Sequence, residues 1–239
     1  MADVTTGQPS PDHEVLAAVL QVRAGSLQVL LWERALEPHA HRWSLPGGRL
    51  GADEDVETSI KRQLAEKVDV RQLSHVEQLA VFSAPDRVPG GRVVATAFLG
   101  LVPADNDPIV PADTRWHPVD ALPRTAFDHE SIVRRARDRL RAKLSYTNIG
   151  FALAPPEFTI SALRGLYSAA LGYKISATNL QRVLSRRGLL EPTGETAAPG
   201  RAGGRPAALF SFAERSMAVT DPFAVLRPPG PGGPTGERS

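Results

Sequence analysis

The distribution of apolar and polar positions divides the chain into a mixed front half and a helical back half. Near the N-terminus, two apolar stretches at 14–22 and 27–32 are separated by Arg23-Ala24-Gly25-Ser26. This pattern predicts two strands joined by a tight turn. Two further apolar stretches, at 76–83 and 92–102, flank a turn rich in Pro and Gly. The four stretches together predict a mixed β-sheet.

Between these pairs of strands lies a glycine-rich loop, Leu45-Pro46-Gly47-Gly48, followed by a predicted helix. Asp53 is placed to cap this helix, because a carboxylate before the first turn accepts hydrogen bonds from free backbone amides. The acidic residues that follow it favour the positive end of the helix dipole. The front half is therefore predicted to be a mixed sheet flanked by helices, an α/β (α+β) fold.

A second helix, dense in arginine, is predicted from about 129 to 144, with Asp128 as its cap. Its apolar residues recur at helical spacing, which gives it one face for packing. Its charged face is either solvated or in contact with a DNA backbone. We predict that it connects two domains. The apolar residues are Ile132, Val133, Ala136 and Leu140, and the arginines are Arg134, Arg135, Arg137, Arg139 and Arg141.

The back half carries clear signals for two short helices. Thr159 precedes an apolar pattern that closes at Gly172, and Ser176 precedes a second one that closes at Gly188. Ser and Thr cap helix starts, and Gly ends helices in the left-handed conformation. Two apolar stretches, around a loop at 194–206, then predict a hairpin with a long tip. Helix, turn, helix and hairpin together predict a winged helix-turn-helix domain.

The second of these helices has an outer face suited to DNA. Arg and Asn form bidentate contacts with guanine and adenine edges in the major groove. Two more arginines lie in the glycine-rich hairpin tip, where they can follow a phosphate strand. The alternative is a helical hairpin with solvated charges and a flexible linker. The candidate DNA-binding residues are Asn179, Arg182, Arg186, Arg187, Arg201 and Arg205.

Charge is divided along the chain in a way that supports this assignment. Residues 12–128 carry 12 Lys and Arg against 17 Asp and Glu, a balance of −5. Residues 130–143 carry six basic and two acidic residues, and residues 157–227 carry nine and five, so each segment has a balance of +4. An acidic front and a basic back predict two functions, with double-stranded DNA as the partner of the back half.

Composition narrows the class of protein further. The chain has 239 residues and no cysteine, which excludes disulfides, thiol catalysis and cysteine-ligated metals. No apolar run reaches membrane-spanning length, and the polar start of the chain is unlike a signal peptide. We therefore expect a cytoplasmic protein that does not contact a membrane.

The loop and first helix, at 45–67, resemble the Nudix box, in which carboxylates hold divalent metals against a diphosphate. The family pattern has glutamates at the positions of Gln63, Glu66 and Lys67, which share one helix face at i, i+3 and i+4. Only Glu66 is acidic here. The degenerate box consists of Glu54, Arg62, Gln63, Glu66 and Lys67.

These substitutions remove the conditions for metal binding. Three carboxylates on one face suit Mg²⁺, whereas Gln63 is neutral and Lys67 is positive. At about 4 Å and an effective dielectric near 20, like charges repel by roughly 4 kcal/mol per unit charge product. We therefore predict no metal site and no catalytic residues, with Lys67 facing a ligand's diphosphate in place of the metal. Arg62 is expected to pair with Glu54 or Glu66.

Taken together, residues 13–212 resemble the Nudix-related transcriptional regulators of NAD metabolism, the NrtR family. Besides the defective box, the resemblance rests on Ala126-Phe127-Asp128-His129 and on Phe158-Thr159-Ile160. It also rests on Gly188-Leu189-Leu190-Glu191 and on the segment that ends in Gly204-Arg205-Pro206.

The resemblance implies a homodimeric repressor of genes for NAD synthesis or salvage, bound to a palindromic operator. It implies that ADP-ribose, a small nucleotide effector, binds the Nudix-like domain and releases the DNA, and that no cofactor is required. For Trp43 and Phe82, the alternative to stacking on adenine is core packing. The expected effector-binding residues are Trp43, Gly47, Gly48, Arg49, Lys67, Phe82 and Arg92.

Two other functions remain open at this stage. One is a Nudix hydrolase of nucleoside diphosphate-linked substrates with a basic accessory domain. The other is a non-catalytic nucleotide-binding module that acts through protein partners. Lys67 disfavours the first and the hairpin arginines disfavour the second. The predicted domains are 12–128 (effector binding), 129–155 (connecting helix and linker), 156–226 (winged helix-turn-helix) and 227–239 (disordered tail).

Overall fold

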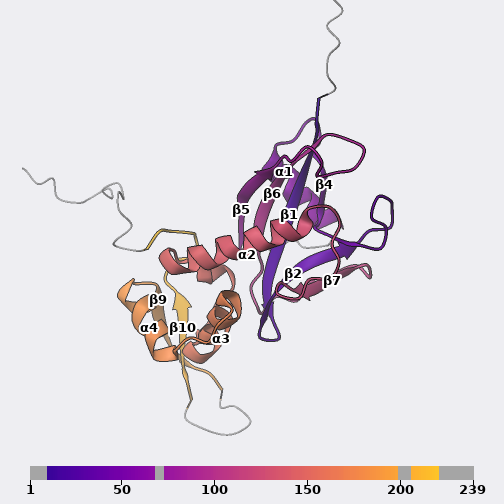
Figure 1. The fold of residues 1–239 in the computed structure, drawn as a ribbon. Helices are drawn as coiled ribbons and strands as arrows, with labels where there is room; N and C mark the ends of the chain where they lie inside the picture. Colours follow the sequence, from indigo (N-terminus) through magenta and orange to yellow (C-terminus); the bar gives the residue numbers. More distant parts are fainter. Residues whose placement is uncertain (1–9, 68–72, 199–205, 221–239) are drawn as a thin grey trace, which may run out of the picture.

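The computed structural model describes residues 10–67, 73–198 and 206–220, which form two packed units (Figure 1). The first unit is built on a seven-stranded sheet in the order β3-β2-β1-β6-β5, with β4 paired to β1 and β7 paired to β2. β1 and β6 are parallel, and the other pairs are antiparallel. The strands are β1 (Asp12–Arg23), β2 (Ser26–Glu33), β3 (Trp43–Ser44), β4 (Gly47–Arg49), β5 (His75–Phe82), β6 (Val93–Leu101) and β7 (Thr114–Pro118).

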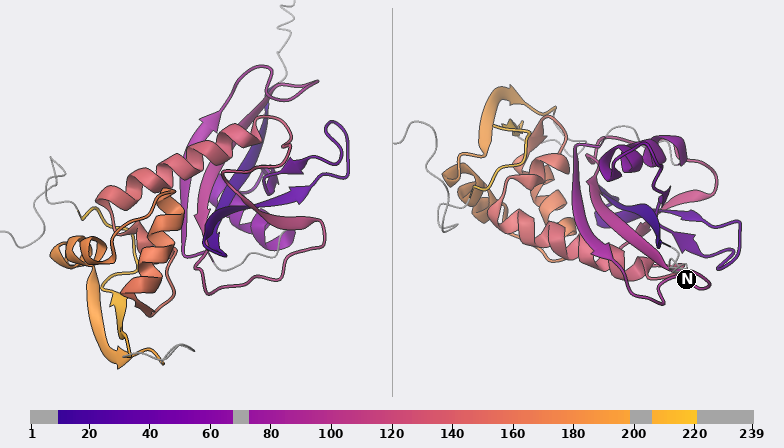
Figure 2. Two further views of the ribbon diagram at one scale, coloured as in Figure 1. Left: turned by 60° about the horizontal axis from the view of Figure 1, so that its bottom comes forward. Right: turned by 90° about the horizontal axis from the view of Figure 1, so that it is seen from above.

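Two helices, α1 (Val56–Lys67) and α2 (His129–Tyr146), cover opposite faces of this sheet (Figure 2). Successive side chains of a strand point to opposite faces, and β1 supplies apolar residues to both. Val15, Ala17 and Val19 pack with Ile60 and Leu64 of α1. Leu16, Ala18 and Leu20 belong to the core that also contains Ile132, Val133, Ala136 and Leu140 of α2. The predicted mixed sheet flanked by helices is confirmed.

The second unit has the predicted winged-helix outline. Its elements are η1 (Ile149–Ala152), β8 (Phe158–Thr159), α3 (Ile160–Leu171), α4 (Ala177–Arg186), β9 (Leu190–Thr196) and β10 (Ala208–Phe212). The strands form a sheet in the order β8-β10-β9. The hydroxyls of Thr159 and Ser176 accept hydrogen bonds from the Ala162 and Asn179 amides at 3.2 and 3.4 Å. Gly172 ends α3 in the left-handed conformation, so the predicted caps and stop are confirmed.

The prediction for Asp53 is wrong, and Asp128 stands at the predicted N-cap position without a side-chain cap bond. The carboxylate of Asp55, not that of Asp53, accepts a hydrogen bond from the Thr58 amide at 2.7 Å, because α1 begins later than expected. Asp128 precedes α2 but makes no side-chain cap, since Arg87 occupies its carboxylate.

α2 joins the two units through a continuous apolar core. Leu163 and Tyr167 of α3 belong to the same core as α2 and β1, and α3 contacts α2, β1 and β2. Arg141 of α2 donates a hydrogen bond to the carbonyl of Ala170 in α3 at 3.1 Å. A displacement of α2 would therefore change the position of α3 in the second unit. The predicted domain boundaries remain predictions, and the predicted tail at 227–239 lies outside the described residues.

In the parts of the chain that the structure describes, no helix is both long enough and apolar enough to cross a bilayer.

Candidate functional site

The glycine-rich loop is held against β1 by a close backbone approach. Gly47 has a φ of 149°, and a Cβ atom added to it would stand 2.1 Å from the carbonyl oxygen of Val15. Residues with side chains are excluded by both the conformation and the contact. Gly48 pairs with Val15 in the β1–β4 ladder, which fixes the loop as a short strand that the apolar pattern did not predict.

The face of α1 that lacks two of the Nudix glutamates lies directly against this loop. Lys67 Nζ donates to the carbonyl oxygen of Gly47 at 2.7 Å, and Gln63 Nε2 donates to that of Arg49 at 3.1 Å. A Cβ added to Gly48 would lie 2.7 Å from Lys67 Nζ and 2.8 Å from Gln63 Nε2 and Oε1. Burial lowers the pKa of Lys67, and the positive charge of Arg62 adds to this. The two substituted side chains thus fill the space beside the loop.

The two remaining carboxylates of the box are held by Arg62. Its guanidinium donates to Glu54 Oε1 and Oε2 at 2.6 and 2.9 Å and to Glu66 Oε2 at 3.0 Å. The bond from Arg62 and a bond from the Gly51 amide lower the pKa of Glu54 to about 2. Arg62 therefore braces the helix, as its spacing predicts.

These residues do not fit a divalent ion. Across 10–67, 73–198 and 206–220, no three His, Asp or Glu side chains are grouped to hold a metal. At the box itself, an ammonium and a neutral amide stand where carboxylates would be needed.

The double variant Gln63→Glu/Lys67→Glu is expected to gain binding of Mn²⁺ or Mg²⁺, because it removes the ammonium and places three carboxylates on one helix face. Calorimetric titration with Mn²⁺ measures the gain. Lys61→Glu is the control, since it adds negative charge to an exposed position of the same helix. Equal Mn²⁺ affinity for the double variant and the control would show that charge on α1 alone attracts the ion.

The other predicted effector residues lie on several elements and differ in exposure. Arg49 is exposed and pairs with Asp12 at 2.8 Å, and Arg92 is exposed and donates to the Ser83 carbonyl at 2.7 Å. Trp43 and Phe82 are half-buried and pack against the larger core. The Trp43 ring also meets that of His117 edge-on, with centroids 4.2 Å apart. The structure therefore brings together Gly47, Gly48 and Lys67, and it gives both aromatic rings a packing role.

A buried ion triad beside the loop was missed by the sequence analysis. Arg87 donates to Glu14 at 2.6 Å and to Asp128 at 2.8 and 3.0 Å, and only 1% of its side chain is exposed. Glu14 lies opposite Arg49 in the β1–β4 ladder. Arg87 sits in the Pro/Gly turn before β6, a composition typical of exposed loops, so no local signal marked it.

His129 adds a second link between the loop region and α2. The Leu45 amide donates to His129 Nδ1 at 3.0 Å. Burial is the main cause that lowers the pKa of His129 to about 3, so the ring is neutral at physiological pH. The start of α2 is thus fixed both to the segment before the glycines and, through Arg87, to β1.

The candidate DNA-contacting face lies on α4. Leu180 and Leu184 are buried, whereas Asn179, Arg182 and Arg186 are exposed. Arg182 donates to the side-chain oxygen of Asn179 at 2.8 Å, so these two side chains lie together. Arg187, at the end of the helix, is half-buried. β9 and β10 form the wing, and its predicted contacts Arg201 and Arg205 lie outside the described residues.

Two family models match the chain along most of its length. Residues 12–136 match the NUDIX domain, and residues 150–212 match the NrtR DNA-binding winged helix domain. The first match contains the glycine-rich loop and α1, and the second contains α3, α4 and the wing strands.

Individual proteins are similar to the whole chain or to part of it. The chain is 31% identical over 212 residues to the ADPR responsive transcriptional repressor NtrR of Acinetobacter baylyi, covering 86% of this chain and 83% of that protein. The crystal structure of Shewanella oneidensis NrtR complexed with a 27mer DNA is similar at a TM-score of 0.70 and 30% identity, covering 83% and 92%. The ADP-ribose pyrophosphatase of Methanocaldococcus jannaschii is 31% identical over 113 residues, or 45% of this chain and 64% of that protein.

Proposed function

The chain belongs to the NrtR family, whose members join a Nudix domain to a winged helix domain, and on that premise we propose that it is an ADP-ribose-responsive transcriptional repressor. The observation that carries the proposal is a combination of two features. The α4 face is rich in exposed Arg and Asn, and Lys67 and Gln63 contact the Nudix-like loop where the family pattern has glutamates. The first binds DNA, and the second binds a nucleotide without cleaving it.

The effector is ADP-ribose, an NAD breakdown product, and the repressed genes serve NAD synthesis or salvage. The residues that we propose to contact ADP-ribose are Gly47, Gly48, Arg49 and Lys67, with Arg92 as a further phosphate contact and Trp43 or Phe82 near the adenine. Relatives support this choice, because one is a repressor that responds to ADPR and another acts on ADP-ribose. The similarity to the ADP-ribose pyrophosphatase favours slow residual hydrolysis, whereas the ammonium of Lys67 disfavours it.

Release of DNA follows from a difference in affinity. A ligand shifts a two-state equilibrium only by binding one state more tightly than the other. α2 connects the effector domain to the DNA-binding domain, since its start is bonded to Glu14, through Arg87, and to Leu45, and its C-terminal half contacts α3. In a homodimer, a change at α2 alters the placement of two α4 helices on the two halves of a palindromic operator.

A gel-shift assay with the protein's own upstream region tests the proposal. A specific complex that dissociates on addition of ADP-ribose is the expected result, with NAD, AMP and ADP as comparison ligands. If ADP-ribose leaves a specific complex intact, the proposal that it is the effector is wrong. If no specific complex forms on this or other promoter DNA, the proposal that the protein is a repressor is wrong.

Arg182→Ala is expected to weaken specific operator binding by about 1–3 kcal/mol and to relax one operator position, because a base-reading arginine forms bidentate contacts. Arg182 also contacts Asn179, so the two side chains act together. The double variant Asn179→Ala/Arg182→Ala should therefore lose less binding free energy than the sum of the two single variants. Arg201→Ala, by contrast, should weaken binding to all sequences similarly. Gel-shift titrations on operator and random DNA measure both effects; equal losses for Arg182→Ala on the two DNAs would refute base reading.

A further inference from the structure

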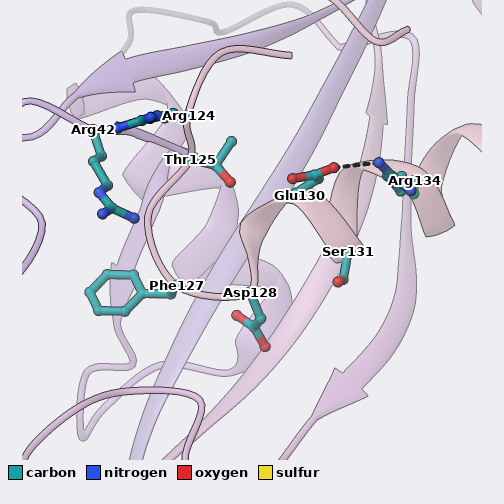
Figure 3. Close-up of a pocket in the computed structure, with 8 residues that line it drawn as sticks. All are labelled: Arg42, Arg124, Thr125, Phe127, Asp128, Glu130, Ser131 and Arg134. Atoms are coloured by element: carbon teal, nitrogen blue, oxygen red, sulfur yellow. Dashed lines mark hydrogen bonds and ion pairs between the residues drawn. The ribbon is translucent and has the colours of Figure 1, made fainter. Parts of the chain in front are cut away.

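A cavity of about 500 Å³ opens at the start of α2 (Figure 3). None of the residues that line it belongs to the glycine-rich loop or to the predicted effector residues. Its volume is in the range of small-molecule sites. Its lining residues are Arg42, Arg124, Thr125, Phe127, Asp128, Glu130, Ser131 and Arg134.

Two arginines on one side of this cavity are held together by the backbone. The Trp43 amide donates to the Arg124 carbonyl at 3.1 Å, and the Ala126 amide donates to the Trp43 carbonyl at 2.8 Å. This ladder sets Arg42 and Arg124 on neighbouring segments, as Figure 3 shows. Among the described residues, neither guanidinium forms an ion pair or a hydrogen bond. Two like charges on neighbouring segments of one cavity wall favour the binding of an anion.

The carboxylates that line the cavity do not offset these charges, because each already has a partner. Asp128 is bound by Arg87, and Glu130 is paired with Arg134 one turn along α2. The walls therefore carry two positive charges without a counter-ion in the described chain.

Phe127 presents an aromatic ring to the same cavity from a strained backbone. Its φ is 50°, in the left-handed region that bulky residues avoid, at a cost of about 1–3 kcal/mol. The Arg34 guanidinium lies 4.9 Å from the ring centroid, and the His39 ring contacts it edge-on at 4.9 Å. These neighbours fix the ring beside the two arginines.

We propose that this cavity binds the diphosphate of a nucleotide between Arg42 and Arg124, with Phe127 against its base or sugar. Guanidinium groups match phosphate geometry through paired hydrogen bonds, and a flat ring suits a base or ribose. The inference rests on the proposed effector function and places part of the effector at a site that the glycine-rich loop does not provide. The loop side supports this division, since Lys67 is already engaged by the Gly47 carbonyl.

The cavity is also connected to the rest of the mechanism. Its wall residue Asp128 is joined through Arg87 to Glu14, which lies opposite Arg49 of the loop. Ser131 and Arg134 belong to the first turns of α2, the helix whose other end contacts α3. A ligand here thus contacts the helix that joins the two units.

Calorimetric titration of the full chain with inorganic pyrophosphate and with ADP-ribose tests the proposal. Arg42→Gln/Arg124→Gln should bind both probes at least about tenfold more weakly, since each charge-assisted bond is worth more than a tenfold change. Phe127→Leu should weaken ADP-ribose several-fold and leave pyrophosphate unchanged. Arg115→Gln is the matched control, because Arg115 is exposed on β7 outside the cavity. Thermal melting of each variant verifies that it is folded.

The outcomes separate this proposal from the effector function. If the double variant binds both probes as tightly as Arg115→Gln does, the cavity proposal is wrong, while binding of ADP-ribose by the unmodified chain keeps the effector in place. If pyrophosphate binding depends on both arginines but ADP-ribose does not bind, the anion site stands and the effector assignment fails. Binding of neither probe by the unmodified chain overturns the cavity proposal, and the gel-shift then judges repression independently.

Discussion

Replacement of Arg87 by methionine is expected to lower the free energy of unfolding by about 3–5 kcal/mol, measured by urea denaturation at pH 7. The reason is that removal of one partner from a buried ion group leaves the others without compensation. The Arg87 side chain is 1% exposed, and Glu14 and Asp128 are 22% and 23% exposed. Desolvation opposes the charge of Arg87, yet its hydrogen bonds to the two carboxylates raise the pKa of the guanidinium overall.

Arg49→Met is the control for this prediction. Arg49 also pairs with an aspartate, at 2.8 Å, but its side chain is 79% exposed. Exposed pairs contribute about 0–1 kcal/mol, so the control should change stability little. Addition of Glu14→Gln and Asp128→Asn to Arg87→Met should recover part of the loss, because neutral amides tolerate burial better than unpaired carboxylates. Equal losses for Arg87→Met and Arg49→Met would refute the role of the buried triad.

Elements that depend on local signals could be predicted from the sequence, whereas the buried triad could not. The β1–β2 hairpin and the helices α3 and α4 were predictable, because the turn at 23–26 and the caps Thr159 and Ser176 act over a few residues. Arg87 gave no such signal, since its partners are 73 and 41 positions away. Contacts of this kind depend on the fold as a whole, so they can only be found once the fold is known.

The contacts of the candidate site also differ in whether a local pattern predicts them. The i, i+4 spacing of Arg62 and Glu66 predicts their ion pair, because helix geometry brings these two side chains together. Glu54 precedes the helix and reaches Arg62 from eight positions away, so its contact depends on the path of the chain before α1. The bond from Lys67 to the Gly47 carbonyl was not predicted. It depends on the packing of α1 against β4, which no local pattern encodes. The cavity at α2 was missed for a similar reason, since Arg42 and Arg124 meet only through backbone pairing of distant segments.

Glu77 forms the main ionic contact between β5 and the C-terminal half of α2. His75 Nε2 lies 2.9 Å from one of its oxygens and Lys143 Nζ lies 2.7 Å from the same oxygen, while Arg139 donates to the other at 3.3 Å. Only 13% of the Glu77 side chain is exposed. Burial alone would raise the pKa of Glu77, but hydrogen bonds from His75 and Lys143 overcome it and lower the pKa from 4.5 to about 2.

Glu77→Gln is therefore expected to reduce stability by about 3 kcal/mol at pH 7, since a carboxylate with a lowered pKa favours the folded state while it is ionised. This contribution is complete above the unfolded-state pKa of 4.5 and is lost as the pH falls from there to about 2. Urea denaturation of the two proteins from pH 7 to pH 2 should give stabilities that converge below pH 4.5. Glu54, whose pKa is also lowered to about 2, titrates in both proteins and cancels in the difference.

The control is Glu57→Gln, which removes an exposed carboxylate paired with Lys61 one helical turn away. Such a pair contributes a few tenths of a kcal/mol, so this variant should follow the unmodified protein at every pH. A difference between Glu77→Gln and the unmodified protein that stays constant down to pH 2 would show that the loss comes from packing. A difference that disappears in acid would show that ionised Glu77 holds α2 against the sheet, and hence that the helix joining the two units is fixed by charge at its C-terminal half as well as at its start.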